Sequence, residues 1–281
     1  MRNKMAAETM VRLLEHARYE VLPTATTEEK VLKYLPKERT ITVTASPGKG
    51  LEATFDLAER LHGHGYPVVP HVAARMVSGR SELTEICDRL AGKGIDSVFV
   101  PGGDAEPAGD YKDAFALLED LAAIGMPFAH VGVAGYPETH PTISDDLTVQ
   151  AMWDKRRHAT HVVSNLTFDP AAIRSWIKRI RDRGITMPVL LGIPGPVERA
   201  KLLNMATKIG VGESTRFLAK NKGLFMRLAA PGGFTGERFL EQCAPALTPP
   251  EALVEGLHVF TFNQIGETEA WRTDLLQRLR S

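Results

Sequence analysis

The sequence of 281 residues has only two cysteines, few aromatic residues and no net charge. Cys87 and Cys243 are too few, and too widely separated, for a disulfide framework or a zinc-binding motif. The 34 Lys and Arg residues are balanced by 34 Asp and Glu residues, so the chain lacks the basic surface typical of proteins that bind nucleic acids or anionic membranes. We therefore expect no metal, no nucleic acid and no membrane among its partners.

Long apolar runs are absent as well. No segment approaches the roughly 18 consecutive apolar residues of a transmembrane helix. The first twenty residues carry Glu8 and Glu15 and no apolar core, which is unlike a signal peptide. These absences predict a cytoplasmic globular protein. Because no linker or low-complexity segment interrupts the sequence, we expect one domain over residues 1–281.

What the chain does contain is a regular alternation of strand-like and helix-like segments. Short β-branched runs predict eight strands, at residues 19–22, 41–44, 68–71, 97–100, 128–134, 161–165, 188–192 and 257–262. Apolar residues at helical spacing predict helices at residues 51–64, 81–91, 111–123, 145–157, 171–183 and 197–209. The stretch 212–255 is long enough for two or three further helices before the last strand.

Glycines punctuate this alternation. A glycine just past a helix end allows the backbone to turn left-handed, and five positions have this place in the pattern: Gly65, Gly94, Gly125, Gly184 and Gly256. The first intervals fit one β/α unit of roughly 30 residues. Eight such units predict a (β/α)₈ TIM barrel with extra helices before the last strand, and an open doubly wound parallel sheet is the alternative.

In such a barrel the active site lies at the carboxyl ends of the strands. Polar residues predicted there are Glu20, Thr44, His71, Asp104, Tyr136, Glu138, His140, Asn165, Asn263 and Gln264. Glu20 interrupts an apolar strand. It either points into the barrel, where burial favours the protonated carboxyl of a general acid, or it lies on a partly exposed first strand.

The other polar residues each allow a functional and a structural interpretation. Asp104 follows two glycines, so it either accepts hydrogen bonds from a ligand or belongs to a tight turn. His71 alone is more typical of a buried core histidine. The cluster at residues 155–157, Lys-Arg-Arg, indicates a solvated helix end, with phosphate binding as the alternative.

Taken together in chain order, these segments resemble the methylenetetrahydrofolate reductase family. The most specific match is Ala134-Gly135-Tyr136-Pro137-Glu138-Thr139-His140-Pro141, which follows the family pattern Ala-x-Tyr-Pro-Glu-x-His-Pro. Weaker collinear matches are Tyr19-Glu20-Val21-Leu22-Pro23, Thr44, Pro70-His71, Gly103-Asp104, Asn165-Leu166-Thr167-Phe168-Asp169, Leu191-Gly192-Ile193 and Phe260-Thr261-Phe262-Asn263.

The resemblance implies an oxidoreductase of one-carbon metabolism and methionine biosynthesis. Such an enzyme passes a hydride from NAD(P)H, here expected to be NADH, through FAD to 5,10-methylenetetrahydrofolate. Catalytic roles would fall to Glu20, as the acid that opens the folate ring, and to Asp104. Folate contacts would come from Asp104, Asn165 and Met205. The residues that would line the flavin are Thr44, His71, Gly103, Asp104, Tyr136 and His140.

Departures from the family pattern fall mostly on the cofactor side. Gly102 stands where the family usually has an arginine facing the flavin, Phe260 stands where tyrosine is common, and Lys155 aligns only after a one-residue shift. Asn165 replaces a glutamine beside the folate. We therefore expect FAD to be bound weakly or not at all. A folate-dependent methyltransferase or demethylase, or a non-catalytic folate-binding subunit, are the alternative functions, and the sequence does not reveal the oligomeric state.

Overall fold

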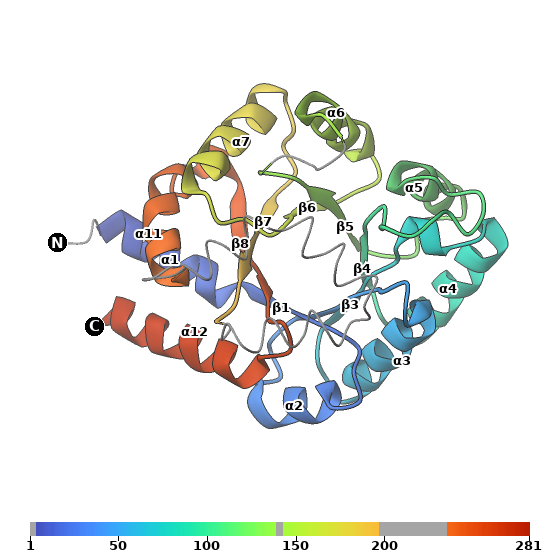
Figure 1. Ribbon diagram of the computed structural model, residues 1–281, viewed down its shortest axis with the longest axis horizontal. Helices are drawn as coiled ribbons and strands as arrows, with labels where there is room; N and C mark the ends of the chain where they lie inside the picture. Colours follow the sequence, from blue (N-terminus) through green and yellow to red (C-terminus); the bar gives the residue numbers. More distant parts are fainter. Residues whose placement is uncertain (1–3, 139–142, 197–234) are drawn as a thin grey trace.

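The computed structural model describes residues 4–138, 143–196 and 235–281, and it shows eight parallel strands arranged in a ring and surrounded by helices (Figure 1). The strands are β1 (Ala17–Val21), β2 (Ile41–Val43), β3 (Val68–Pro70), β4 (Ser97–Val100), β5 (His130–Gly135), β6 (His161–Ser164), β7 (Val189–Pro194) and β8 (Val254–Phe260). Their order is β3-β2-β1-β8-β7-β6-β5-β4. The two edges, β3 and β4, are joined by an isolated parallel bridge between His71 and Phe99. The predicted (β/α)₈ barrel is confirmed.

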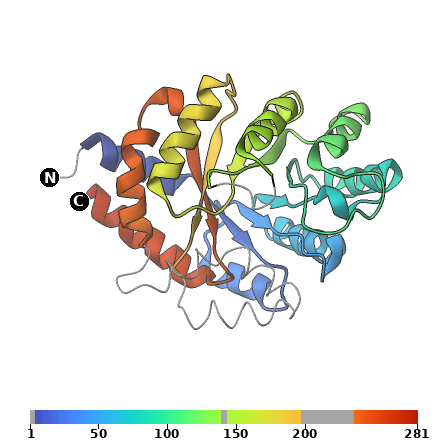
Figure 2. The ribbon, with the colours of Figure 1, turned by 45° about the horizontal axis from the view of Figure 1, so that its top comes forward.

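Helices cover the outside of this ring (Figure 2). Those described are α1 (Lys4–Glu15), α2 (Thr27–Tyr34), α3 (Gly50–Gly63), α4 (Arg80–Gly92), α5 (Ala114–Ala123), α6 (Asp145–Lys155), α7 (Pro170–Asp182), α11 (Gly236–Leu247) and α12 (Ile265–Arg280), with 3₁₀ turns η1 (Ala74–Met76) and η2 (Pro250–Ala252). None of these helices is long and apolar enough to cross a bilayer.

The structure confirms five of the predicted helices and adds three that were not predicted. Helices α3 to α7 match their predicted ranges within a few residues, whereas the range 197–209 lies outside the described residues. α11 and η2 lie before the last strand, as expected. Sequence periodicity missed α1, α2 and α12. In α2 the reason is composition, because half of its eight residues are charged and only Thr27 and Val31 are buried.

Positive φ angles confirm four of the five predicted helix-ending glycines, Gly65, Gly94, Gly125 and Gly184. The prediction for Gly256 is wrong, because this residue lies inside β8. A Cβ atom at Gly256 would lie 2.3 Å from the carbonyl oxygen of His16. Glycine is needed there because the end of α1 passes directly against β8.

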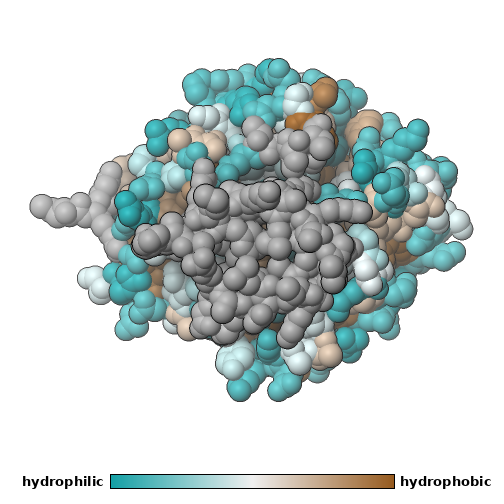
Figure 3. All heavy atoms as spheres, viewed as in Figure 1, coloured by the Kyte–Doolittle hydropathy of each residue, from teal (hydrophilic) through white to brown (hydrophobic). Residues whose placement is uncertain are grey.

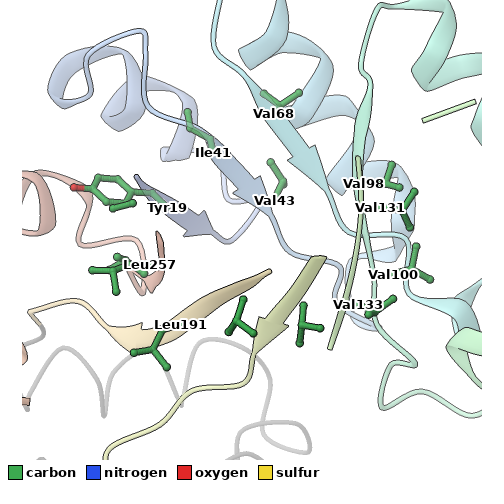
Figure 4. Close-up of a cluster of buried hydrophobic side chains, with 14 of the residues drawn as sticks. Tyr19, Ile41, Val43, Val68, Val98, Val100, Val131, Val133, Leu191 and Leu257 are labelled. Atoms are coloured by element: carbon green, nitrogen blue, oxygen red, sulfur yellow. The ribbon is translucent and has the colours of Figure 1, made fainter. Parts of the chain in front are cut away.

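Side chains of the strands alternate between two apolar layers. Tyr19, Ile41, Val98 and Leu191 point outward into the main core between strands and helices (Figure 4). A separate small cluster, formed by Val69, Phe99, Val163 and Leu190, lies inside the barrel. The helices turn hydrophilic residues to solvent, and these dominate the periphery of the face seen in Figure 3. Inward positions not filled by the small cluster are therefore the ones where polar side chains can meet.

Behind β1, a buried polar network joins the strand to α12. The Tyr19 hydroxyl donates to Glu269 Oε2 at 2.5 Å, and Arg272 donates to both oxygens of the same carboxylate, at 2.9 and 2.6 Å. Burial alone would raise the pKa of Glu269, but the hydrogen bonds from Arg272 and Tyr19 outweigh it and leave the pKa below its ordinary value. The network thus stabilises the strand that carries Glu20.

Replacing Tyr19 by Phe should lower the free energy of unfolding by about 1.5–3 kcal/mol at pH 7, because a carboxylate loses one charge-assisted hydrogen bond. Urea unfolding measures this loss. Since the pKa of Glu269 is lowered by folding, its contribution is present above its unfolded value of 4.5 and fades as the pH falls through the lower folded value. The difference between the two proteins should therefore shrink in acid. Tyr34→Phe, at a 45% exposed ring, should stay within about 0.5 kcal/mol of the wild type; an equal loss in both variants would contradict the network's role.

Candidate active site

The Glu20 carboxyl lies inside the barrel. Because side chains alternate along β1, the outward position of Tyr19 turns Glu20 inward. Glu20 Oε2 is 2.9 Å from Nε2 of His258 and 3.8 Å from Nε2 of His71, and the Glu20 side chain keeps only 15% of its surface exposed. Of the two positions that the sequence left open for Glu20, the structure shows the inward one. A carboxyl held there can give or take a proton.

His71 does not act as a charged partner of this carboxyl. Its ring is buried and meets Phe99 edge-on, with centroids 4.8 Å apart. Burial lowers the pKa of His71 to about 4, with His258 adding to the effect and Glu20 opposing it. His71 is therefore neutral near pH 7, and its Nε2 atom is buried without a hydrogen-bond partner among the described residues.

A second polar layer lies nearer the amino ends of the strands. Arg18, two residues before Glu20, places Nη1 3.3 Å from Nε2 of His161. Burial, together with the nearby charge of Arg18, lowers the pKa of His161 to about 3, so the ring is neutral. Because a guanidinium only donates, Nε2 of His161 accepts, and Nδ1 carries the hydrogen toward Thr160 Oγ1 at 2.9 Å. Gly132 leaves the room for this ring, since a Cβ atom there would lie 2.7 Å from His161 Nε2.

The chain after β8 clamps the backbone at Glu20 and at Leu22, two residues further on. Thr261 Oγ1 donates to the carbonyl oxygen of Glu20 at 2.6 Å. The Asn263 amide accepts from Leu22 N at 2.8 Å and donates to Leu22 O at 3.1 Å. Phe262 and Asn263 both have left-handed backbones, with φ of 49° and 56°, and this turn aims the Asn263 side chain back at β1. The predicted strand-end polar residue Asn263 is therefore a structural clamp.

The loop after β4 forms one wall of the barrel mouth. Gly103 has a left-handed backbone, with φ of 86°, that favours glycine. The loop is held against η1, because Arg75 N donates to Gly102 O at 3.0 Å. Asp104 follows, exposed at the mouth. Burial and the neighbouring Asp104 carboxylate raise the pKa of Tyr136, so these two predicted residues from different loops lie near each other.

The segment after β5 and the segment after β6 are tied together by Glu138. Its Oε1 atom accepts hydrogen bonds from Thr167 Oγ1 at 2.9 Å, Phe168 N at 2.6 Å and Asp169 N at 2.8 Å. Glu138 thus shapes the mouth. Asn165 is exposed at the end of β6, where its Oδ1 accepts from the following backbone N–H at 2.8 Å.

Other predicted residues have different positions. Thr44 is buried, and its hydroxyl donates to Val21 O at 3.3 Å. His140 and Met205 lie outside the described residues. Lys155 is buried in the last turn of α6, which corrects its assignment to a solvated helix end, and burial lowers its pKa. Because α6 leads into the amino end of β6, Lys155 also lies at the opposite end of the barrel from the mouth.

Sequence reasoning missed three inward residues, Arg18, His161 and His258. Each is a polar side chain within a strand, the same signal that singled out Glu20. Among the described residues, no group of three or more His, Cys, Asp and Glu side chains has metal-binding geometry. The interior thus combines one carboxyl at the mouth with buried imidazoles, an arrangement suited to proton transfer.

Comparison with known proteins assigns this barrel to a family. A sequence model described as methylenetetrahydrofolate reductase matches residues 24–270. The chain belongs to the methylenetetrahydrofolate reductase family. A protein of Caenorhabditis elegans named "Probable methylenetetrahydrofolate reductase (NADPH)" is 22% identical over 197 residues, which cover 66% of this chain and 29% of that protein. The chain therefore aligns with under a third of the length of this relative.

In this member of the methylenetetrahydrofolate reductase family, the donors available for FAD depend on the side chains at the barrel mouth. Lys49 Nζ donates to Pro23 O at 2.7 Å, and Arg75 Nε donates to Lys112 O at 2.8 Å. Gly102 offers only its backbone. Among the described residues, each of these two cations thus gives one N–H to a loop carbonyl and keeps its remaining N–H groups, whereas Gly102 supplies no side-chain donor.

Replacing Asn263 by Ala should lower the free energy of unfolding by about 2–4 kcal/mol, because hydrogen bonds to Leu22 are lost and alanine is strained in a left-handed backbone. Thermal or urea unfolding measures the loss. Asn263→Gly is the matched control, since it removes the same hydrogen bonds without the backbone strain. It should be the less destabilised variant. Two variants of wild-type stability would show that Asn263 does not clamp β1.

Proposed function

We propose that the protein reduces 5,10-methylenetetrahydrofolate to 5-methyltetrahydrofolate with NADH, and that Glu20 supplies the proton. The observation that carries this proposal is the inward carboxyl of Glu20 at the barrel mouth, held by His258 and by the backbone clamp from Thr261 and Asn263. Family membership supports the substrate and the reaction type.

The reaction needs one proton and one hydride. The Glu20 carboxyl gives its proton to the folate nitrogen whose bond to the bridging carbon breaks. The five-membered ring then opens, and the bridging carbon becomes part of an electrophilic iminium. A hydride from the reduced nicotinamide adds to that carbon and produces the methyl group, and Glu20 regains a proton from water. General acid catalysis of this kind contributes typically 10²–10⁴ in rate.

The mouth residues provide groups for binding folate. Asp104 is exposed on the loop after β4, where its carboxylate is suited to accept hydrogen bonds from the N–H edge of a pterin. Asn165 uses Oδ1 for its own loop, which leaves its amide N–H groups for the substrate. Tyr136, near Asp104, adds an aromatic wall with a neutral hydroxyl. Met205 and His140 complete the proposed set, from the resemblance alone.

We further propose that the hydride passes directly from NADH to the folate iminium without FAD. Gly102, which has no side-chain donor where the family pattern has an arginine, supports this view. Direct transfer requires the two reacting carbons to approach within about 3–3.5 Å in one pocket. NADH is proposed over NADPH, although the printed name of the nematode relative specifies NADPH.

Glu20→Gln should lower kcat for NADH-dependent reduction of methylenetetrahydrofolate by about 10²–10⁴, with little change in KM, because the proton donor is lost while the shape is kept.

Asp104→Ala should instead weaken folate binding about ten- to a hundredfold, through loss of a charged acceptor worth about 1.5–3 kcal/mol. Steady-state kinetics and calorimetric titration with folate separate the two effects.

Circular dichroism of both variants serves as the control for folding. Wild-type turnover by Glu20→Gln would show that this carboxyl is not the acid. Unchanged folate affinity of Asp104→Ala would show that Asp104 does not bind folate and is only part of a tight turn.

The purified protein should be colourless and should oxidise NADH in the presence of methylenetetrahydrofolate, with a rate unaffected by added FAD. An absorption spectrum and an NADH assay with and without FAD make the measurement, and NADPH is assayed beside NADH. A yellow protein with stoichiometric FAD, or activity that needs added FAD, would overturn direct transfer and leave the reductase activity standing. Methyl transfer without NADH consumption would instead favour a folate-dependent methyltransferase.

A further inference from the structure

His258 is the inward residue of β8 that contacts the Glu20 carboxyl most closely. Its Nε2 atom is 2.9 Å from Glu20 Oε2, and its side chain is only 2% exposed. The ring of Phe260 meets it edge-on at 4.8 Å between centroids, and Phe99 lies on another side at 6.5 Å. The imidazole is therefore fixed in place by its neighbours, so that its contact with Glu20 is a defined one.

The environment of the second ring nitrogen indicates which tautomer is present. Nδ1 of His258 is buried and has no hydrogen-bond partner in the described part of the chain. A buried N–H without a partner is rarer in proteins than a buried acceptor without one. The ring hydrogen therefore belongs on Nε2, where it is donated to Glu20 Oε2.

This hydrogen bond makes the two oxygens of Glu20 unequal. Oε2 accepts from His258 and also faces His71 Nε2 at 3.8 Å, which is too long for a hydrogen bond. Oε1 has no hydrogen-bond partner among the described residues. A proton on Oε2 would collide with the hydrogen on His258 Nε2, so the acid form carries its proton on Oε1.

We propose that His258 is a positioning residue that fixes the Glu20 carboxyl and directs its transferable proton to Oε1. This inference rests on the proposed function, since it assigns the atom from which the proton leaves. The other groups around the pair do not replace His258: His71 is too distant to donate, and the Arg18 guanidinium is engaged with His161.

The kinetic test uses His258→Leu, which removes the donor, and His258→Gln, whose amide N–H can reach the same oxygen. His258→Leu should lower kcat about ten- to a hundredfold with KM changed less than about threefold, because a small misplacement of the acid slows the reaction without weakening binding. His258→Gln should recover most of that loss. Equal losses in both variants would overturn the proposal.

A double-mutant cycle asks whether His258 acts through Glu20. In a Glu20→Gln background, His258→Leu should lower the residual kcat less than about twofold, because no transferable proton remains to be directed. His161→Leu is the matched control, as it removes another buried inward histidine that does not contact Glu20. Its effect should be the same in both backgrounds. If His258→Leu lowered kcat by the same factor in both backgrounds, His258 would be a packing residue that does not act through Glu20, and the proposal would be wrong.

A measurement on the resting protein separates this inference from the proposed reaction. In ¹⁵N spectra of histidine-labelled protein, the signal lost in His258→Gln identifies His258. It should have the shift pattern of a ring that carries its hydrogen on Nε2, and Glu20→Gln should move it. A ring protonated at Nδ1, or a signal that Glu20→Gln leaves in place, would overturn the inference whatever the activity. The expected spectra from a protein that does not turn over methylenetetrahydrofolate would instead refute only the proposed function.

Discussion

The parallel pairing of β1 with β8 is the constraint on which the site depends. Its register sets Arg18 beside His258 and Glu20 beside Phe260. One strand therefore contributes the carboxyl, and the other contributes the imidazole and the turn that holds the carboxyl's backbone. A one-residue slip would turn every inward side chain of the strand outward and place Tyr19, with its apolar ring, inside the barrel. The network of Tyr19, Glu269 and Arg272 on the outer side opposes such a slip.

The polar groups inside the barrel form two layers, one with hydrogen-bond partners and one with unpaired atoms. The lower layer satisfies them, because Arg18, His161 and Thr160 bond to one another. The upper layer leaves atoms without partners, since His71 Nε2, His258 Nδ1 and Thr42 Oγ1 are buried and unpaired within the described chain. Unpaired polar atoms are costly in a packed interior and are typical of functional sites. The satisfied polar groups therefore lie nearer the amino ends of the strands, and the unpaired ones lie nearer the mouth.

Much of the fold could be predicted from the sequence, because buried parallel strands typically consist of short runs of β-branched residues. The eight strands followed from that signal, and Gly65 or Gly94 marked helix ends through their left-handed backbones. Gly256 looked the same in sequence but serves close packing within a strand. The inward direction of Glu20 could not be decided until the outward place of Tyr19 was known. The roles of Asn263 and Glu138 were beyond reach, because each depends on a turn that brings distant segments together.

The pairing of β1 with β8 also joins the earliest and latest parts of the chain. Glu20 and His258 are 238 residues apart in sequence, and Glu20 and Thr261 are 241 apart. At the usual rate of synthesis of about 5–20 residues per second, the ribosome makes these partners roughly ten to fifty seconds after Glu20. Until then β1 has an unpaired edge on that side, and its carboxyl lacks both its clamp and its imidazole. Contacts of such long sequence separation slow folding, so the nascent barrel exposes an unpaired strand edge, a surface open to pairing with another chain, until its last strand is in place.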